Sequence, residues 1–437
     1  MSVKHACLII TLFVSFSFSM YSCDEASEPI PDVTTDKDSL TNQTTLNVLD
    51  YGADNTGVTD CSAAFEKLIK AMGTNSQIDI YLPAGKYRIA KRILFDQSNF
   101  SGYSTSHGLR FHGAGEDVTE LICDNTQGGF YFDAGTNLIT VTVEDLSFVA
   151  AKDNSGTAIE FNTAGQNSGD HHSRMFQVRN VLIRGDKFDN GYFLNGILCY
   201  NAWYPMLDNV DITARYGTGS EKYKMGIGIL FQDCYSPIVT SSYFWGNASY
   251  GLMYKGVNIS PEDGIVEDSY FVGQENGIYI DLADLPNWSE PAFHVTNCHI
   301  NYLKNGLFLK GIRQAFISSN LFYCHNEAGS RWKKDTNPVS SYESRDINCD
   351  YASDIIIANN QFTEPASPKR VAVDISANCG NIMIQSNIFN LDATGIRNNS
   401  TKTSYSMGNV FGGDPSFAVG LVPYVDNTGT LKIIDYN

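Results

Sequence analysis

The chain has 437 residues and a formal net charge of −18 at pH 7, with 43% hydrophobic and 12% aromatic residues. This apolar content is enough for a continuous core, although the length alone would allow two or three domains. With 48 acidic against 30 basic side chains, the chain lacks the basic surface that a phosphate backbone requires. We therefore expect no nucleic-acid partner.

The N-terminal residues 1–22 have the pattern of a targeting segment. Lys4 precedes an apolar run over residues 6–18, which is too short to span a membrane. Ser22-Cys23 after this run resembles a bacterial lipoprotein signal, and the acidic residues 24–28 resemble the surface-export signal of Bacteroidetes lipoproteins. An ordinary cleaved secretory peptide is the alternative.

The lipoprotein interpretation predicts lipidation of Cys23 and an anchor in the outer membrane of a Gram-negative bacterium. The protein would then be periplasmic or exposed on the cell surface. Residues 23–45 are polar without periodicity, which predicts a flexible tether. We expect residues 46–437 to form one domain.

A short helix is predicted soon after the tether. Asp60 is a suitable N-cap, and the apolar residues that follow it recur at helical spacing. These residues are Ala64, Phe65, Leu68, Ile69 and Met72. Strands are expected over residues 78–82 and 87–93, around a Pro83-Ala84-Gly85 turn. The helix would cover the open end of a stacked β-structure.

The same region resembles the N-terminal signature of the pectate-lyase superfamily. The matching residues are Asp50, Gly52, Ala53, Gly57, Asp60, Ala64, Phe65, Leu82, Pro83, Ala84, Gly85 and Tyr87. The resemblance implies an all-β fold, a right-handed parallel β-helix with a short capping helix at its N-terminus. The superfamily includes polygalacturonase-like glycosidases, polysaccharide epimerases and phage tailspikes, so the signature indicates architecture and leaves the reaction open.

The rest of the chain repeats one unit, seen most clearly in DSYFVGQENGIYIDL at residues 268–282. Each unit has a short strand that ends on an apolar residue, a turn and a second strand. An Asn, Asp or Ser usually lies two or three places before the apolar residue. The ten apolar residues are Phe148, Ile183, Ile212, Phe244, Phe271, Ile300, Phe322, Phe362, Phe389 and Phe411. Irregular spacing around a constant unit indicates stacked coils with loop insertions.

Eight of the ten cysteines lie beyond residue 23 and form neither a CxxC pair nor a zinc-like cluster. Cys199, Cys298 and Cys349 fall at positions that should face inward. We expect these side chains to be buried as small hydrophobic groups rather than joined in disulfides. We expect no metal site or cofactor; calcium stays an open alternative that no motif supports.

Outward residues of the second strands should form two rows, because side chains alternate along a strand and coils stack about 4.8 Å apart. The nearer row is Glu160, Leu198, Leu230, Met253, Tyr279, Phe308, Asn348, Ala372 and Arg397. The farther row is Asn162, Tyr200, Gln232, Lys255, Asp281, Lys310, Asp350, Asp374 and Asn399.

The middle of the farther row holds the candidate catalytic residues Asp281, Lys310, Asp350 and Asp374. Asp281 and Asp350 would lie roughly 9–10 Å apart, near the upper end of the separation in inverting glycosidases. Repulsion between Asp350 and Asp374 on adjacent coils would raise one pKa, as a general acid requires. A structural ladder of ion pairs is the alternative.

Candidate substrate-binding residues surround this row. Tyr279 and Phe308 would stack on sugar rings, with Lys255 at one end of the row. Loops before and after the strands add further candidates: Glu275, Trp288, Arg331 and Trp332. Polygalacturonases carry Asn-Thr-Asp, Asp-Asp and Gly-His-Gly motifs near this strand. Only Glu275 is acidic at the matching turns, so the resemblance transfers no mechanism.

The leading functional hypothesis is an enzyme that cleaves a polysaccharide bound along the β-helix. We favour hydrolysis slightly over β-elimination, because carboxylates outnumber cationic groups in the row. Lyases of the superfamily use Lys or Arg as the base, and Lys255 or Lys310 would serve. The alternative is a non-catalytic surface protein that binds glycans or mediates adhesion.

Overall fold

The computed structural model describes residues 43–73, 77–96, 98, 107–136, 139–163, 175–186, 190–215, 224–258, 263–282, 292–324, 343–363, 369–391, 393–412 and 420–434. Residues from Asn42 to Asn437 form one compact unit. The predicted signal segment, Cys23 and the tether up to residue 42 lie outside the described residues. Strand β1 (Gln43–Asn47) begins before the expected domain start at residue 46, because its residues pair with β3 (Gln77–Tyr81).

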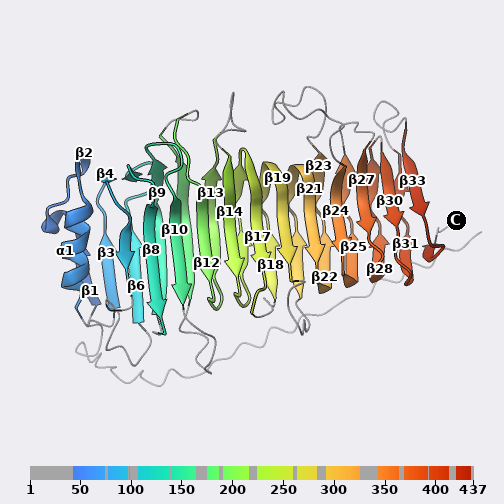
Figure 1. The fold of residues 1–437 in the computed structure, drawn as a ribbon, viewed down its shortest axis with the longest axis horizontal. Coiled ribbons are helices and arrows are strands. Elements are labelled where there is room, and N and C mark those ends of the chain that lie inside the picture. The colour runs from blue at the N-terminus through green and yellow to red at the C-terminus, as the bar shows by residue number, and fades with distance from the viewer. Residues whose placement is uncertain are drawn as a thin grey trace, which may run out of the picture. The chain divides into compact units, whose positions relative to one another are not determined.

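The fold is a right-handed parallel β-helix in which each coil contributes to three parallel ladders, here named A, B and C. Figure 1 shows the coils following one another in chain order from α1 (Ser62–Met72) to β33 (Val422–Asp426). The repeated sequence unit predicted the strands of ladders B and C. It did not predict that the strands of ladder A form a third ladder.

Ladder A is formed by the strands that open each coil. It runs through β1, β3, β6 (His107–His112), β9 (Ile139–Ala150), β11 (Phe176–Gly185), β13 (Met206–Thr213), β15 (Ile238–Thr240), β18 (Gly264–Glu267), β20 (Phe293–Thr296), β22 (Arg313–Ser318), β25 (Ser353–Ala358), β28 (Gly380–Gln385), β31 (Ser404–Met407) and β34 (Leu431–Ile434).

Ladder B follows ladder A after a sharp corner in each coil. It runs through β2 (Thr56–Asp60), β4 (Gly85–Ile89), β7 (Thr119–Cys123), the second halves of β9, β11 and β13, β16 (Tyr243–Trp245), β19 (Tyr270–Asp281), β21 (His299–Lys310), β23 (Leu321–Cys324), β26 (Gln361–Thr363), β29 (Ile388–Asn390) and β32 (Val410–Phe411).

Ladder C carries the outward rows expected from the sequence. It runs through β5 (Ile93–Phe95), β8 (Gly128–Gly135), β10 (Thr157–Thr163), β12 (Asn195–Tyr200), β14 (Met225–Gln232), β17 (Ala248–Lys255), the second halves of β19 and β21, β24 (Ser344–Asp350), β27 (Arg370–Ile375), β30 (Thr394–Asn398) and β33.

The predicted row of ten apolar residues is confirmed as the inner row of ladder B. Every neighbouring pair, from Phe148 and Ile183 to Phe389 and Phe411, is in register. Nine of these side chains are buried in the core, and Phe411 at the end of the row is partly buried. Aromatic rings stack along the row, as between Phe362 and Phe389 with centroids 4.7 Å apart.

The corner between ladders A and B explains the polar residue that accompanies each apolar one. A residue with positive φ lies three places before each member of the apolar row. The corner residues are Asp145, Asn180, Asn209, Ser241, Asp268, Asn297, Ser319, Asn359, Ser386 and Gly408. Glycine has no Cβ, and short polar side chains hydrogen-bond locally, so these residue types tolerate the left-handed conformation.

Buried asparagines connect the corners of the last coils. Asn320, Asn360 and Asn387 lie two places before the apolar row and are almost fully buried. The side-chain amide of Asn360 donates to the carbonyl of Ile317 at 2.9 Å and to Oδ1 of Asn387 at 3.0 Å. The backbone N–H of Asn360 also donates to Asn387 Oδ1, at 2.8 Å. These bonds satisfy groups that the sharp corner would otherwise leave unpaired.

The predicted helix is confirmed as α1, which lies at the N-terminal end of the coils (Figure 1). Its five predicted apolar residues are all buried, and Phe65 contacts Phe130 edge-to-face, with ring centroids 6.0 Å apart. The N-cap residue is Cys61 rather than Asp60. Asp60 lies one place earlier, where its carboxylate accepts hydrogen bonds from the backbone N–H and the hydroxyl of Ser62.

The eight cysteines beyond residue 23 are buried free thiols, and the inward orientation predicted for Cys199, Cys298 and Cys349 is confirmed. The Sγ atoms of Cys199 and Cys234 lie 3.9 Å apart. Burial raises the pKa of the Cys123 thiol. A raised pKa keeps the Cys123 thiol protonated and unreactive. All eight thiols are buried, so these cysteines fill the core as small hydrophobic groups.

Candidate functional site

A row of charged side chains follows the far end of ladder C. Lys255 pairs with Asp281, Asp281 with Lys310, and Lys310 with Asp350, on four consecutive coils. All four side chains are partly exposed. The strand alternation that buries Ile280 and Leu309 turns these residues outward. The sequence analysis therefore placed these four residues correctly on one surface.

Hydrogen bonds and an ion pair position the centre of this row. Lys310 Nζ lies 3.3 Å from Oδ1 and 3.4 Å from Oδ2 of Asp281. The Ser376 hydroxyl donates to Asp350 Oδ1 at 2.9 Å. One carboxylate thus faces a cation, whereas the other accepts a hydrogen bond from a neutral hydroxyl.

A partly buried aromatic row lies directly beside the charged one. Met253, Tyr279 and Phe308 are in register, and the rings of Tyr279 and Phe308 are 4.6 Å apart between centroids. Tyr250 meets Tyr279 edge-to-face at 5.0 Å. Burial, together with the charges of Asp281 and Asp350, raises the pKa of Tyr279 to about 12. The negative charges of Asp281 and Asp350 therefore both act on the Tyr279 hydroxyl.

Amide and charged side chains lie at the end of the aromatic row and next to it. Asn305 donates to Oδ1 of Asn276 at 2.7 Å, and Asn348 donates to Oδ1 of Asn305 at 3.3 Å. Glu275 forms an ion pair of 2.6 Å with Lys224. Asn348 is in register with Phe308, so an amide continues the aromatic row, and the charged row lies beside both.

The structure corrects the expected position of Asp374. Val373, not Val371, is in register with Ile347 and Ile396, so Asp374 pairs with Asn348 and Arg397 in the nearer row. The expected repulsion between Asp350 and Asp374 as neighbours in one row is therefore wrong. A shift of two residues keeps the inward and outward alternation, so hydrophobic pattern alone cannot detect it.

Asp374 belongs to a network of ion pairs beside the candidate site. Its carboxylate accepts from Arg345 Nε at 2.6 Å and from Arg397 Nε at 2.8 Å. Both arginines also contact Glu343, at 2.7 Å and 2.6 Å. Two guanidinium partners occupy this carboxylate, which makes it a structural element rather than a proton donor.

Several predicted residues lie outside the described residues. These are Trp288, Arg331 and Trp332 in the loops and Cys23 near the N-terminus. Among the described side chains, no group of three or more His, Cys, Asp or Glu could hold a metal ion. Within that same part of the chain, no helix has the length and apolar character to cross a membrane.

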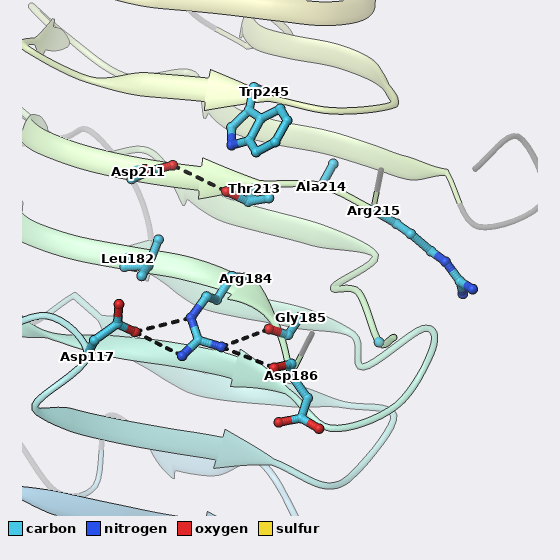
Figure 2. Close-up of a pocket in the computed structure, with 11 residues that line it drawn as sticks. Asp117, Leu182, Arg184, Gly185, Asp186, Asp211, Thr213, Ala214, Arg215 and Trp245 are labelled. Carbon is cyan, nitrogen blue, oxygen red and sulfur yellow. Dashed lines mark hydrogen bonds and ion pairs between the residues drawn. The ribbon is translucent and has the colours of Figure 1, made fainter. Parts of the chain in front are cut away.

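A pocket on the outer face of ladder B was missed by the sequence analysis. It has a volume of about 550 Å³ and is lined by residues of β11, β13 and β16 and the segments beside them, among them Asp211, Arg184 and Trp245. Figure 2 shows Arg184 bonded to Asp117 on one side of the pocket and Trp245 beyond Thr213 on the other. Arg215 points away from these side chains (Figure 2).

Asp211 is the most perturbed carboxyl of this pocket. Burial and the nearby charge of Glu116 raise its pKa to about 6, against the lowering effect of the Thr213 hydroxyl. Burial also raises the pKa of Glu116, together with the charges of Asp117 and Asp145. A signal in the sequence could have found the pocket, because Asp211 and Thr213 flank Ile212 of the apolar row and must therefore face outward.

The two carboxylates of the ladder C row have a separation suited to displacement at a sugar carbon. Asp281 and Asp350 lie two coils apart, or roughly 9–10 Å along the ladder. Inverting glycosidases hold their acid and base about 6.5–9.5 Å apart, and side-chain rotation can close the remaining difference. The pocket on ladder B faces away from this row, on a different side of the coil.

Comparisons with known proteins agree with the fold. Residues 45–308 match the family described as "Rhamnogalacturonase A/epimerase, pectate lyase-like". No curated protein matches the chain in sequence.

Solved structures are similar over nearly the whole unit. The A-module of mannuronan C-5 epimerase AlgE6 from Azotobacter vinelandii has a TM-score of 0.62 at 13% identity, covering 90% of this chain and 99% of that one. The DFA-IIIase of Arthrobacter chlorophenolicus A6, without its lid and in complex with GF2, gives 0.57 at 13% identity, with 90% and 98% covered. The surface adhesin PfbA of Streptococcus pneumoniae gives 0.50 at 15% identity, with 90% and 98% covered. These likenesses confirm the parallel β-helix expected from the sequence.

Proposed function

The chain belongs to the rhamnogalacturonase A/epimerase, pectate lyase-like family, and from this premise we propose that it is an enzyme that hydrolyses a polysaccharide on the outer face of ladder C. The proposal rests on one observation above all. Asp281, Lys310 and Asp350 occupy three consecutive coils of one partly exposed row. Family membership alone does not choose the reaction, because one fold hosts several chemistries.

The partners of the two carboxylates support different roles for them. Asp281, beside the Lys310 ammonium, would act as the general base that accepts a proton from water. Asp350, bonded to the neutral Ser376 hydroxyl, would act as the general acid. In the reaction, Asp350 gives its proton to the glycosidic oxygen as the bond from that oxygen to the anomeric carbon breaks. The water activated by Asp281 attacks the same carbon from the opposite face, which inverts its configuration.

The aromatic row would hold the sugar rings. Tyr279 and Phe308 are partly exposed. Each is the outward-facing residue that comes directly before Asp281 or Lys310 on its strand. The aromatic faces are apolar and suit the C–H faces of a sugar ring, while the partly exposed amide of Asn348 would bind one of its hydroxyls. A glycan lying across the ladder would therefore place a glycosidic bond over the charged row.

β-Elimination is the second candidate, and the two lysines favour it. Lys255 and Lys310 flank Asp281 along the row, so a uronate carboxylate bound there would meet two cations. Neutralising that carboxylate acidifies the adjacent C–H, which a base must remove before the leaving oxygen departs. This chemistry requires an acidic polysaccharide, whereas hydrolysis does not.

The test is cleavage of a panel of plant, host and microbial polysaccharides, both neutral and uronate-containing. Hydrolysis predicts new reducing ends without ultraviolet absorbance, and elimination predicts both. Asp281→Asn and Asp350→Asn should each abolish product formation. Asp133→Asn is the matched control, because Asp133 lies in the same outward row but four coils before Lys255.

Three results would contradict the proposal. Glycan binding without product for the whole panel would instead support the non-catalytic adhesion alternative. Wild-type rates for Asp281→Asn or Asp350→Asn would remove that residue from the mechanism. An equal loss in Asp133→Asn would show that the changes act through the fold rather than the site.

A further inference from the structure

The pocket on ladder B continues into a row of exposed aromatic rings. Asp211 is in register with Tyr243, and Tyr243 with Tyr270, so the three lie on successive coils. Tyr243 is 37% exposed and Tyr270 is 47% exposed, with ring centroids 5.4 Å apart. Trp245, from the same strand as Tyr243, lies in the pocket wall beside Thr213. Aromatic faces therefore extend from the pocket along the outer surface.

The pocket offers a carboxyl group that has little to bond within the protein. Within the part of the chain that the structure describes, the Asp211 side chain accepts one long hydrogen bond, of 3.4 Å, from the Thr213 hydroxyl. Asp211 is mostly buried, and a buried polar group gains free energy from each hydrogen bond that it completes. A carboxyl group in this position suits the hydroxyls of a bound ligand.

The charges around the pocket restrict the chemistry of that ligand. Three lining side chains are acidic, namely Asp117, Asp186 and Asp211, against the two basic side chains Arg184 and Arg215. The guanidiniums are already engaged, since Arg184 lies 2.8 Å from both Asp117 and Glu120 and Arg215 lies 2.7 Å from Asp153. An anionic ligand would therefore meet net repulsion. A neutral ligand rich in hydroxyl groups would not.

We propose that this pocket and the aromatic residues beside it, Trp245, Tyr243 and Tyr270, form a second saccharide-binding site that takes a neutral oligosaccharide. The volume of about 550 Å³ lies within the range of about 300–1,000 Å³ that is usual for small-ligand pockets. The rings supply stacking surfaces, and Asp211 and Thr213 supply hydrogen bonds. The site lies on ladder B, so it goes beyond the proposed catalytic function of ladder C and does not require it.

The ladder B pocket and the ladder C row differ in charge. Lys255 and Lys310 accompany the carboxylates of ladder C, whereas carboxylates predominate around the ladder B pocket. A binding site separate from the cleavage site would hold the chain of a polysaccharide near the enzyme and raise its local concentration. The geometry thus assigns anchoring, rather than bond cleavage, to ladder B.

The experiment is isothermal titration calorimetry of the Asp350→Asn protein, in which cleavage is expected to be blocked. The ligands are the linear tetrasaccharides of β-1,4-glucose, β-1,3-glucose, α-1,4-glucose, β-1,4-mannose and β-1,4-galactose, with tetragalacturonate and tetramannuronate for comparison. At least one neutral tetrasaccharide should bind, and Tyr270→Ala and Trp245→Ala should each weaken that binding about tenfold or more.

Phe316→Ala is the matched control. Phe316 is an aromatic residue of ladder A that is 46% exposed, close to the 47% of Tyr270 on ladder B. It should leave the affinity unchanged. Because Trp245 packs against Val272 and Leu303, its loss could disturb the fold. Tyr270 is half-exposed and its ring contacts Tyr243 and His299 on the surface, so Tyr270→Ala leaves the core packing in place and keeps the test decisive.

Three outcomes would overturn the inference. Binding of no neutral tetrasaccharide would remove the ligand class, as would a uronate tetrasaccharide whose binding Tyr270→Ala weakens more than that of every neutral one. Undiminished affinity in Tyr270→Ala would place the bound saccharide elsewhere. The two proposals fail separately, because product formation reports on Asp350 of ladder C and the calorimetric affinity reports on Tyr270 of ladder B.

Discussion

The raised pKa of Asp211 predicts a stability that depends on pH in an unusual direction. Its folded-state pKa is about 6, against an ordinary value of 3.8. Between these values the folded protein keeps a proton that the unfolded chain has released, so the free energy of unfolding falls as pH rises. Above about pH 6 this loss in the free energy of unfolding is complete and amounts to at most about 3 kcal/mol.

Asp211→Asn removes the titrating group and keeps its shape. The variant should gain stability over the wild type as pH rises, by about 2 kcal/mol between about pH 4 and pH 8. Urea denaturation of both proteins at each pH measures this difference. Since the Glu116 charge contributes to the raised pKa, Glu116→Gln should reduce the effect.

Asp124→Asn is a control of opposite sign. Hydrogen bonds from Lys152 and Arg88 hold the pKa of Asp124 below its ordinary value. Its contribution to stability is present above that ordinary value and is lost as pH falls through the folded-state pKa. Asp124→Asn should therefore destabilise the protein more at pH 8 than at low pH. An equal effect of Asp211→Asn at both pH values would refute the reasoning.

Two further predictions concern groups inside the coils. Asp346 and Arg370 form a fully buried ion pair with an N–O distance of 2.6 Å, to which the Tyr302 hydroxyl adds a 2.6 Å hydrogen bond. Arg370→Met should lower the free energy of unfolding, measured by urea denaturation, by about 3–5 kcal/mol, because the Asp346 charge is left uncompensated. Adding Asp346→Leu should restore much of this loss. A double variant no more stable than the single one would contradict this explanation. Asn360→Ala removes hydrogen bonds to the Asn387 side chain and the Ile317 carbonyl. It should lower the free energy of unfolding by about 1–3 kcal/mol in the same measurement. An unchanged free energy of unfolding would show that water replaces those bonds.

The inner row of ladder B could be predicted from the sequence because two constraints coincide in each coil. The corner requires a residue that tolerates positive φ, such as Asn297, and the core requires an apolar residue three places later, such as Ile300. Loop insertions change the spacing between coils but not within this unit. The sequence pattern therefore predicted the register of this inner row of ladder B correctly in all ten coils.

The position of Asp374 could not be predicted in the same way. Both Val371 and Val373 are buried, so either could have been aligned with Ile347 on hydrophobic pattern alone. The positive-φ residue that fixes register in ladder B lies at the corner between ladders A and B, so it does not fix the register of β27 in ladder C. Hydrogen-bond register and the Arg345 and Arg397 contacts decide the alignment.

The ladder B pocket depends on tertiary contacts that the repeat analysis did not consider. Asp211, Tyr243 and Tyr270 each lie one place before a residue of the apolar row, so their outward orientation could have been predicted. Their combination into a hollow could not, because Arg184 and Asp117 come together across 67 residues of sequence.

The central claim is that a glycan lies across the ladder C row during catalysis. Its most direct test is the crystal structure of the Asp350→Asn protein with an oligosaccharide substrate identified by the cleavage assay. We predict a sugar ring on Tyr279 or Phe308 and a glycosidic oxygen within hydrogen-bond reach of residue 350. An ordered saccharide found solely on another face, with the Asp281–Lys310 ion pair untouched, would contradict the account.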